Sequence, residues 1–476
     1  PFMKVVDSQM LAFNQGVTRR GSYASYMDIN HPEIEEFINI RKESGGDINR
    51  KCLNIHNGVN ITNEFLQAVQ EDADWRLIDP KTGEAVKTIN ARDLWWQIIN
   101  TRAETGEPYM INIDTCNEAL PKEQKALGLS IRQSNLCSEI TLATNEERTA
   151  VCCLSSVNLE HYDTWSKNDK FISDLITMLD NVVQHFIDNA IDTTELGDYN
   201  ANFKRFKSHI REGKEGFTKS SFSAYRERSL GLGAMGFHAY LQKNNFPFEG
   251  IFATGFNNKA FNYIKTKAVS ASQALAELRG EAPDITGAGL RNAHLLAVAP
   301  NASSSIICGG TSPSIEPYRA NIFTHKTLSG SYQVKNKYLD KIINKKKGNK
   351  TNIWKEITAK KGSIQDMDIF TDKEKEIFKT ADELNQIWIV EHAHMRQQYV
   401  CQSQSVNLFF VSPKATEPQE VHDDYLQYLN DVHWYAMHKL KSLYYFRSES
   451  ARDAENVNIK IPRIKLDEVD CIACEG

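Results

Sequence analysis

Apolar side chains recur at helical spacing most clearly between residues 170 and 190. The set consists of Phe171, Ile172, Leu175, Ile176, Leu179, Val182, Val183 and Phe186. A repeat of three to four residues places side chains on one face of a helix, and such a face is buried against other elements. We therefore predict a helix here that contributes to the core and has no chemical role.

Shorter patterns predict the surrounding elements. Segment 2–11 fits a short helix or a strand, and the alternation over 23–29 fits a strand. A proline near the first turn is favourable, so His31-Pro32-Glu33 should begin a helix. Further strands are expected at 150–159, 295–299 and 441–447, a helix at 425–440, and helix caps at Asn63 and Asp93.

Composition narrows the class of protein. The chain has 476 residues, of which 41% are hydrophobic and 25% charged, with a net charge of −5. A chain of this length can form two to four domains or one large barrel. Its ordinary composition and small net charge give no reason to expect nucleic-acid or membrane-surface binding. No apolar run reaches the roughly 20 residues that span a bilayer, and no signal peptide opens the chain, so we expect a cytoplasmic protein. Pro1 fits either a natural start after methionine removal or a fragment boundary.

Nine cysteines are spread irregularly along the chain. An odd count in a long chain argues against a secreted disulfide framework, so each thiol is either a buried residue or a chemical group. In the stretch Asn135-Leu136-Cys137-Ser138-Glu139, an extended backbone would turn the amide, thiol and carboxylate to one side. The thiol can give up a hydrogen atom, the carboxylate can move a proton and the amide can hold a hydroxyl. On spacing alone, a buried structural cysteine with polar neighbours is the commoner outcome.

The predicted strand 295–299 runs into a turn rich in hydroxyl groups, Asn301-Ala302-Ser303-Ser304-Ser305. Backbone amides at a helix start together with hydroxyl donors form an anion site, although a plain Ser-rich cap fits equally well. The arginine pair at 19–20 could bind phosphate or be solvated.

Three other motifs carry less weight. Gly231-Leu232-Gly233-Ala234-Met235-Gly236 matches a dinucleotide fingerprint, but charged residues precede it, so close packing at a strand-to-helix turn is the better interpretation. The lysine-rich segment 335–350 is expected to be a solvated surface insertion. We expect no metal at His392 and His394.

The last dozen residues are acidic and lack core positions, so a mobile tail is predicted. Cys471 and Cys474 within it can cycle between dithiol and disulfide. A zinc knuckle would need a second ligand pair, which this segment does not provide.

Taken together, these motifs resemble the large catalytic subunit of class Ia ribonucleotide reductase. Five separated stretches occur in that family's order, namely the loop 15–21, Asn135-x-Cys137-x-Glu139, the strand at Cys152, the turn 300–305, and Tyr444-Tyr445 followed by the cysteine-pair tail. Gln404-Ser405-Val406-Asn407 and segment 318–330 add family-like sequence, so the resemblance runs nearly end to end.

The resemblance implies a role for each motif. Cys137 would become a thiyl radical that removes the 3′-hydrogen of a ribonucleoside diphosphate, Glu139 would take the 3′-hydroxyl proton and Asn135 would bind the substrate. Cys152, which keeps the family's spacing to Leu154 better than Cys153 does, would belong to the pair that supplies two electrons.

The remaining implied roles concern binding, relay and regulation. Leu154 and the diphosphate turn would bind the substrate, and this turn consists of Asn301, Ala302, Ser303, Ser304 and Ser305. Tyr444 and Tyr445 would transfer the radical, and Cys471 and Cys474 would re-reduce the internal pair. Gln15 and Arg19 would transmit the effector signal. The radical would come from a small subunit of the diiron-tyrosyl type, the effectors would be dNTP or ATP, and thioredoxin or glutaredoxin would reduce the tail. No covalently bound cofactor is implied.

The family's fold is an α/β barrel of ten strands in two antiparallel half-barrels, with the radical cysteine on a central finger loop. We accordingly expect an effector loop and strand over 1–30, the catalytic barrel over 31–460 and a redox tail over 461–476. In the family a long portion carrying the ATP cone, the first strands and the partner of Cys152 precedes the loop at Gln15. The expectation is thus a C-terminal part, either a fragment or a split-gene product completed by a separate N-terminal chain in a hetero-oligomer. A trans-splicing intein is disfavoured, because its downstream half would not begin with Pro1.

Two departures and two alternatives accompany this interpretation. Ala302 stands where some relatives have an acidic residue, and no other cysteine is an evident partner for Cys152. A cobalamin-dependent reductase would share the barrel and the cysteine without needing the tyrosine pair. A protein of another class, a catalytically inactive regulatory or assembly partner, would keep the interfaces alone.

Overall fold

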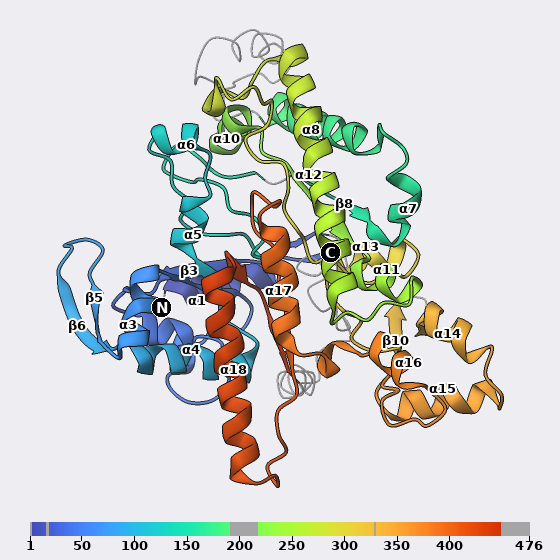
Figure 1. Cartoon of the computed structure of the whole chain (residues 1–476). Helices are drawn as coiled ribbons and strands as arrows, with labels where there is room; N and C mark the ends of the chain where they lie inside the picture. The colour runs from blue at the N-terminus through green and yellow to red at the C-terminus, as the bar shows by residue number, and fades with distance from the viewer. Residues whose placement is uncertain (1, 16–18, 152, 191–217, 328–329, 449–476) are drawn as a thin grey trace.

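The fold is known from a computed structural model, which describes residues 2–15, 19–151, 153–190, 218–327 and 330–448 (Figure 1). Within these ranges, no helix combines the length and the apolar character needed to cross a membrane.

The N-terminal part is built on a sheet in which β3 (Ala24–Asp28), β4 (His56–Ile61) and β7 (Tyr109–Asn112) run parallel. A short antiparallel strand near the C-terminus, β13 (Ser442–Leu443), completes the sheet in the order β13-β7-β4-β3. Helix α2 (Ile34–Ile38) packs beside β3 and β4, and α4 (Ala91–Thr105) packs on both α2 and α3 (Asn63–Glu71). Their buried faces belong to the main hydrophobic core.

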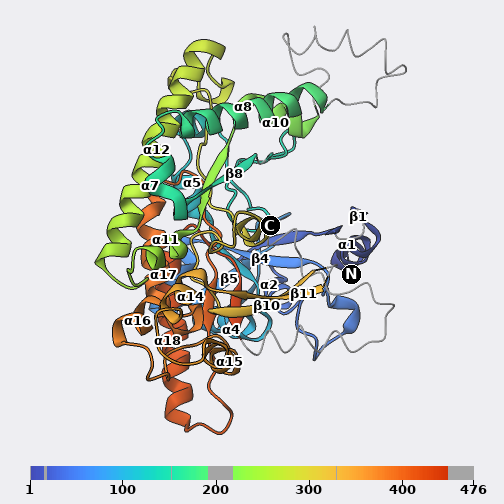
Figure 2. The ribbon, with the colours of Figure 1, turned by 90° about the vertical axis from the view of Figure 1, so that its right-hand side faces the viewer.

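A second parallel pair, β8 (Leu154–Asn158) and β9 (Gly231–Met235), lies in the other half of the molecule (Figure 2). Residues 295–299 extend it, because Leu232 donates its backbone N–H to the carbonyl of Leu295 at 2.8 Å. The long helices α8 (Phe171–Asn189) and α12 (Ile251–Arg279) pack on each other and cover this half (Figure 1).

The segment from Ser403 to Phe410 joins the two halves. On one side Ser405 donates its backbone N–H to the carbonyl of Val298 at 2.9 Å. On the other side Tyr444 donates its backbone N–H to the carbonyl of Val406, also at 2.9 Å. Beyond this point β12 (Leu408–Phe410) pairs in parallel with β14 (Phe446–Ser448). The architecture is therefore α/β with mostly parallel strands. The longest sheet in the described ranges has four strands, and a ten-stranded arrangement is not assigned there.

The remaining helices and strands of the described residues are mostly shorter. These are α1 (Phe2–Ala12), β1 (Asn14–Gln15), β2 (Arg19–Arg20), β5 (Asp74–Ile78), β6 (Ala85–Asn90), α5 (Ile113–Glu118), α6 (Lys122–Ala126), α7 (Tyr162–Trp165), α10 (Lys219–Glu227), α11 (Phe237–Lys243), α13 (Ala302–Ile307), β10 (Ile322–Thr327), β11 (Gly330–Lys335), α14 (Lys337–Ile343), α15 (Lys350–Ala359), α16 (Asp372–Ile377), α17 (Gln386–Gln397) and α18 (Gln419–Lys439). Helices α14 to α16 surround a separate small core, so the lysine-rich segment predicted to be a solvated insertion contains a helix with buried apolar residues (Figure 1).

Several predicted elements are confirmed. The 170–190 stripe is helix α8, whose buried residues include Ile172, Ile176, Leu179 and Val183. Segment 2–11 is helical, and strand β3 and helices α2 and α18 lie where expected. The 295–299 segment is extended, with a single assigned bridge at Val298.

The predicted caps were wrong. The cap of α3 is Thr62, one residue before Asn63, and its hydroxyl accepts the backbone N–H of Phe65. The cap of α4 is Asn90, whose side chain accepts the N–H of Asp93. In both places the predicted residue lies inside the first turn.

The glycine motif at 231–236 packs closely, as predicted. A Cβ at Gly233 would lie 2.5 Å from the carbonyl oxygen of Ala297 on the neighbouring segment. Gly236 has a φ of 81° at the start of α11, a left-handed conformation that glycine adopts without steric cost.

Candidate active site

The segment 132–141 is an irregular loop, so the side-chain alternation of an extended backbone does not apply to it. The backbone turns at Leu136–Ser138, and Ser138 has a left-handed φ of 65°. Contacts from distant parts of the chain fix this turn. Ser442 donates its hydroxyl to the Ser138 carbonyl at 2.8 Å, and the Tyr26 hydroxyl donates to the Asn135 carbonyl at 2.5 Å.

Ser405 contacts both Cys137 and Glu139, the residues predicted to supply the thiol and the carboxylate. Its hydroxyl lies 2.5 Å from the backbone carbonyl of Cys137 and 3.3 Å from Oε2 of Glu139. Asn135 is on the same loop, where its Oδ1 accepts the backbone N–H of Ile140 at 3.3 Å. Cys137 is 6% exposed and Glu139 is 2% exposed, so thiol and carboxylate are both shielded from water.

Burial changes the acid strength of Glu139. Loss of hydration raises the pKa of this carboxyl to about 7, because desolvation outweighs the hydrogen bonds from Asn135 and Ser405 that stabilise its charged form. A carboxylate with a pKa near neutrality can accept and return a proton at physiological pH.

Two adjacent phenol rings lie beside Cys137. The hydroxyl of Tyr444 is 3.5 Å from the Cys137 sulfur, and the Tyr444 and Tyr445 ring centroids are 4.2 Å apart. Both tyrosines follow β13 directly, so the sheet that carries β7 also places them. The predicted thiol and the predicted tyrosine pair are thus brought together in one small buried cluster.

The cluster includes residues that the sequence did not single out. Tyr109 on β7 packs 4.9 Å from Tyr444 and 5.2 Å from Tyr445, centroid to centroid. His56 at the start of β4 stacks on Tyr109 and touches Tyr445. These side chains come from strands that are far apart in the sequence, and neither has a local motif that would reveal it. Ser405 was quoted only within a family-like stretch.

The serine-rich turn forms the junction that was predicted. Asn301 is left-handed with a φ of 54°, and helix α13 begins at Ala302. The hydroxyl of Ser156, on β8, donates to Oδ1 of Asn301 at 2.9 Å. Ser303 and Ser304 are half-buried, whereas Ser305 is buried and donates its hydroxyl to the carbonyl of Ala302.

The turn and the cysteine loop flank the same segment of chain. Val298, just before the turn, donates its N–H to the carbonyl of Ser403 at 3.1 Å, and Ser403 donates its N–H to the carbonyl of Glu139 at 2.9 Å. Leu154, also predicted to bind substrate, is 38% exposed on β8 beside β9.

Other predicted site residues are less fully described. Gln15 pairs with Arg19 across two short antiparallel strands. Cys152, Cys471 and Cys474 lie outside the described residues, as does the predicted tail 461–476.

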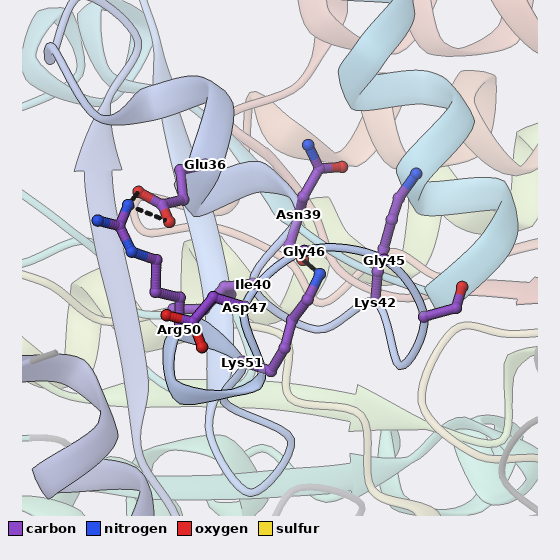
Figure 3. A pocket seen from close by; sticks show the side chains of 10 residues that line it. Glu36, Asn39, Ile40, Lys42, Gly45, Gly46, Asp47, Arg50 and Lys51 are labelled. Atoms are coloured by element: carbon purple, nitrogen blue, oxygen red, sulfur yellow. Dashed lines mark hydrogen bonds and ion pairs between the residues drawn. The ribbon is translucent and has the colours of Figure 1, made fainter.

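A surface hollow near α2 contains none of the predicted site residues (Figure 3). It has a volume of about 370 Å³ and is lined in part by Glu36, Lys42 and Lys51. Arg50 bonds to both carboxylate oxygens of Glu36 at its edge, at 2.7 and 2.6 Å. We assign no chemistry to it, because the reactive groups described above lie elsewhere.

Comparison with known proteins decides the family. The profile described as "Ribonucleotide reductase, barrel domain" matches residues 1–285 and 282–446. The chain belongs to the ribonucleotide reductase large-subunit family. Membership makes it an oxidoreductase of deoxyribonucleotide synthesis.

Individual relatives agree. The ribonucleoside-diphosphate reductase large subunit of Invertebrate iridescent virus 3 is 41% identical, with 100% of this chain and 80% of that protein covered. A putative large subunit of Frog virus 3 (isolate Goorha) is 45% identical, with 100% and 78% covered. Among solved structures, the Actinobacillus ureae class Id ribonucleotide reductase alpha subunit has a TM-score of 0.74 and 32% identity, over 95% of this chain and 74% of that one. The α/β architecture of this reductase chain is therefore that of the family.

Proposed function

We propose that this chain reduces ribonucleoside diphosphates to deoxyribonucleoside diphosphates with a thiyl radical on Cys137. The observation that carries the proposal is the 3.5 Å contact between the Tyr444 hydroxyl and the Cys137 sulfur in a buried cluster. A phenol at hydrogen-bonding distance from a thiol can take its hydrogen atom once the phenol has been oxidised. Burial protects the resulting radical from water and from bulk reductants.

Substrate chemistry is assigned to groups on the same loop. Cys137 would remove the 3′-hydrogen, Glu139 would accept the 3′-hydroxyl proton and Asn135 would hydrogen-bond the sugar. The pKa of Glu139, raised to about 7, suits a group that must accept and return a proton. The turn from Asn301 to Ser305 would hold the diphosphate with backbone amides and hydroxyls, and Leu154 would border the substrate.

The electrons and the radical would reach the substrate site from groups outside the Cys137 loop. Cys152 would supply electrons as one member of a redox pair, and Cys471 and Cys474 on a redox tail would restore it, reduced in turn by thioredoxin or glutaredoxin. Tyr444 and Tyr445 would conduct the radical from a small subunit of the diiron-tyrosyl type. The loop around Gln15 and Arg19 would respond to dNTP or ATP effectors, and the strands would form part of the family's ten-stranded barrel.

Cys137→Ser tests the radical assignment. In a mixture with a radical-bearing small subunit, a reductant and a ribonucleoside diphosphate, this variant should form no deoxynucleotide, because a hydroxyl holds its hydrogen too strongly to act in place of a thiol. Cys116→Ser is the matched control, since Cys116 is an equally buried free thiol outside the tyrosine cluster. Product formation by Cys137→Ser at the control's rate would refute the assignment.

Phenylalanine at 444 or 445 tests the relay. Each variant keeps the ring and its packing but lacks the hydroxyl that must be oxidised, so turnover should stop while substrate binding remains. Tyr162→Phe, at a buried phenol of the main core, should retain activity. Unchanged turnover in the 444 and 445 variants would favour a cobalamin-dependent reductase, and inactivity of the unmodified chain with every radical source would favour a regulatory partner.

Replacing both tail cysteines with serine tests the electron route. A single turnover should be preserved, because the internal pair begins reduced, and repeated turnover with a protein reductant should stop. Full repeated turnover would exclude the shuttle.

A further inference from the structure

Tyr445, the outer of the two relay tyrosines, lies against His56, whose ring also faces the buried carboxylate of Glu107. Its hydroxyl is 3.4 Å from Nδ1 of His56, and the two rings meet edge to face with centroids 5.9 Å apart. The same Nδ1 lies 2.6 Å from Oε1 of Glu107. One ring nitrogen therefore faces both a phenolic and a carboxylate oxygen.

Glu107 is held firmly. Its side chain is 2% exposed, Oε2 accepts the backbone N–H of Asn57 at 3.0 Å, and Arg41 lies 3.4 Å from Oε1. Arg41 is anchored independently, because it donates to the carbonyls of Leu53 and Ile55. The positive charge of Arg41 and the contacts with His56 keep the pKa of Glu107 below its ordinary value despite burial. A buried charge pair of this kind is expensive to maintain, which favours a use for it beyond stability.

Three further side chains that contact the Tyr445 ring are not proton acceptors. The guanidinium of Arg447 lies over the ring, 4.1 Å from its centroid, and is a cation. Tyr109 and Tyr444 present phenol rings at 5.2 Å and 4.2 Å, centroid to centroid, and are themselves weak acids. Among these contacts of Tyr445, the groups that can receive a proton are the imidazole of His56 and, through it, the carboxylate of Glu107.

We propose that His56 accepts the phenolic proton of Tyr445 when this tyrosine is oxidised and passes its own proton to Glu107, with Arg41 positioning the carboxylate. The inference rests on the proposed function, since it requires Tyr445 to act in the relay. His56 is then a catalytic residue of the radical pathway, distinct from the groups that touch substrate.

The step balances as follows. The electron leaves Tyr445 for the radical of the small subunit, and the O–H bond of Tyr445 breaks. The proton held between Nδ1 and Oε1 first moves to Glu107, which frees the lone pair of Nδ1, and the phenolic proton then forms a new N–H bond at Nδ1 of His56. An oxidised phenol is a much stronger acid than a carboxylic acid, so even a carboxyl of lowered pKa can hold this proton. Tyr445 regains a hydrogen atom from Tyr444, and on the return journey the pair gives its proton back as the small subunit recovers its radical.

His56→Ala tests the proposal in the full complex with the small subunit. We expect kcat to fall about 100-fold, the lower end of what a positioned acid or base contributes, with the KM for the ribonucleoside diphosphate unchanged. Imidazole added to the medium should restore a large part of the rate, since the variant leaves a ring-sized space beside the phenol. Pyrazole, of the same shape but a far weaker base, should restore little.

Matched variants separate proton transfer from packing. Glu107→Gln keeps the shape and the hydrogen bond from Nδ1 but cannot take a proton, so it should lower kcat in the same direction. His438→Ala removes an exposed histidine of α18 and should have no effect. Thermal unfolding and small-subunit affinity, measured for every variant, show that the loss is not one of folding or docking.

The outcomes are distinguishable. If Tyr445→Phe is inactive while His56→Ala turns over at the normal rate, or if imidazole and pyrazole act alike on a folded, docking-competent His56→Ala, the proton-acceptor role is overturned. If Tyr445→Phe itself turns over normally, the relay fails instead, and with it the proposed function.

Discussion

Glu139 should affect stability and activity in opposite directions as pH changes. Burial raises the pKa of its carboxyl from an ordinary value of 4.5 to about 7. A group whose folded-state pKa is raised contributes stability that is fully present below the unfolded pKa and is lost as pH rises through the folded pKa. One pKa unit corresponds to about 1.4 kcal/mol, so ionising Glu139 in the folded chain should cost about 3 kcal/mol.

Glu139→Gln removes this cost, because the amide has nearly the same shape and never ionises. We expect the variant to gain about 3 kcal/mol relative to the unmodified chain between pH 4.5 and pH 8.5, with most of the gain building up between pH 4.5 and pH 7 and little further change above pH 7. The measurement is the free energy of unfolding by urea at a series of pH values for both chains. Other titrating groups are common to both, so they cancel in the difference.

Glu227→Gln is the matched control. This carboxyl is also buried, its pKa is also raised to about 7, and it accepts a hydrogen bond from Ser223 at 3.1 Å, but it lies outside the Cys137 cluster. Both substitutions should flatten the pH dependence of stability, and only Glu139→Gln should abolish turnover. In the unmodified enzyme, turnover should rise with pH through about 7 as Glu139 becomes a base. Parallel stability curves for the unmodified chain and Glu139→Gln would refute the reasoning.

Three further predictions concern packing and polar contacts. Gly233→Ala should destabilise the chain by about 1–3 kcal/mol in denaturant unfolding, because its Cβ would overlap the Ala297 carbonyl at 2.5 Å; a change below about 0.5 kcal/mol would contradict this. Asp284→Ala should cost about 3–5 kcal/mol by the same measurement, since it leaves the buried guanidinium of Arg148 without the carboxylate it contacts at 2.5 and 3.0 Å; a near-neutral change would show that the pair is not important for stability. Ser405→Ala should raise the pKa of Glu139 further, because it removes a hydrogen bond that stabilises the carboxylate. The acidic limb of the pH–rate profile should then move to higher pH. An unchanged limb would show that this hydrogen bond does not stabilise the carboxylate.

The sequence predicted best what depends on local periodicity. Helix α8 has a long apolar stripe, and residues within one helix determine it. The helix caps were predicted wrongly for an equally local reason, because Thr62 and Asn63 are both polar and either could begin α3. Which of the two accepts the N–H of Phe65 depends on how the chain enters the helix, which the pattern does not record.

The site was predictable only where a residue belongs to a recognisable motif. Cys137 and Tyr444 were identified by resemblance, and the structure brings their side chains together. His56 at the start of β4 was missed, as were Glu107 just before β7 and Tyr109 at its start, because nothing in their local sequence indicates that the two strands bring them together near Tyr445. The turn within the cysteine loop could not be predicted for a related reason: the left-handed conformation at Ser138 depends on Ser442, about 300 residues later in the chain.

Long-range contacts of this kind explain how a loop without regular structure can hold a reactive sulfur in place. The Asn135 carbonyl accepts from Tyr26 on β3, the Cys137 carbonyl from Ser405, and the Ser138 carbonyl from Ser442 on β13. Two of these donors thus come from the N-terminal sheet, and the third comes from the segment that joins this sheet to Val298 in the other half. Because a loop carbonyl that is buried without a partner costs about 1–3 kcal/mol, any shift of the loop that breaks one of these bonds is penalised. The sulfur can therefore stay within reach of Tyr444 only when the sheet and the joining segment are both in place, which couples the folding of distant parts of the chain to the geometry of radical transfer.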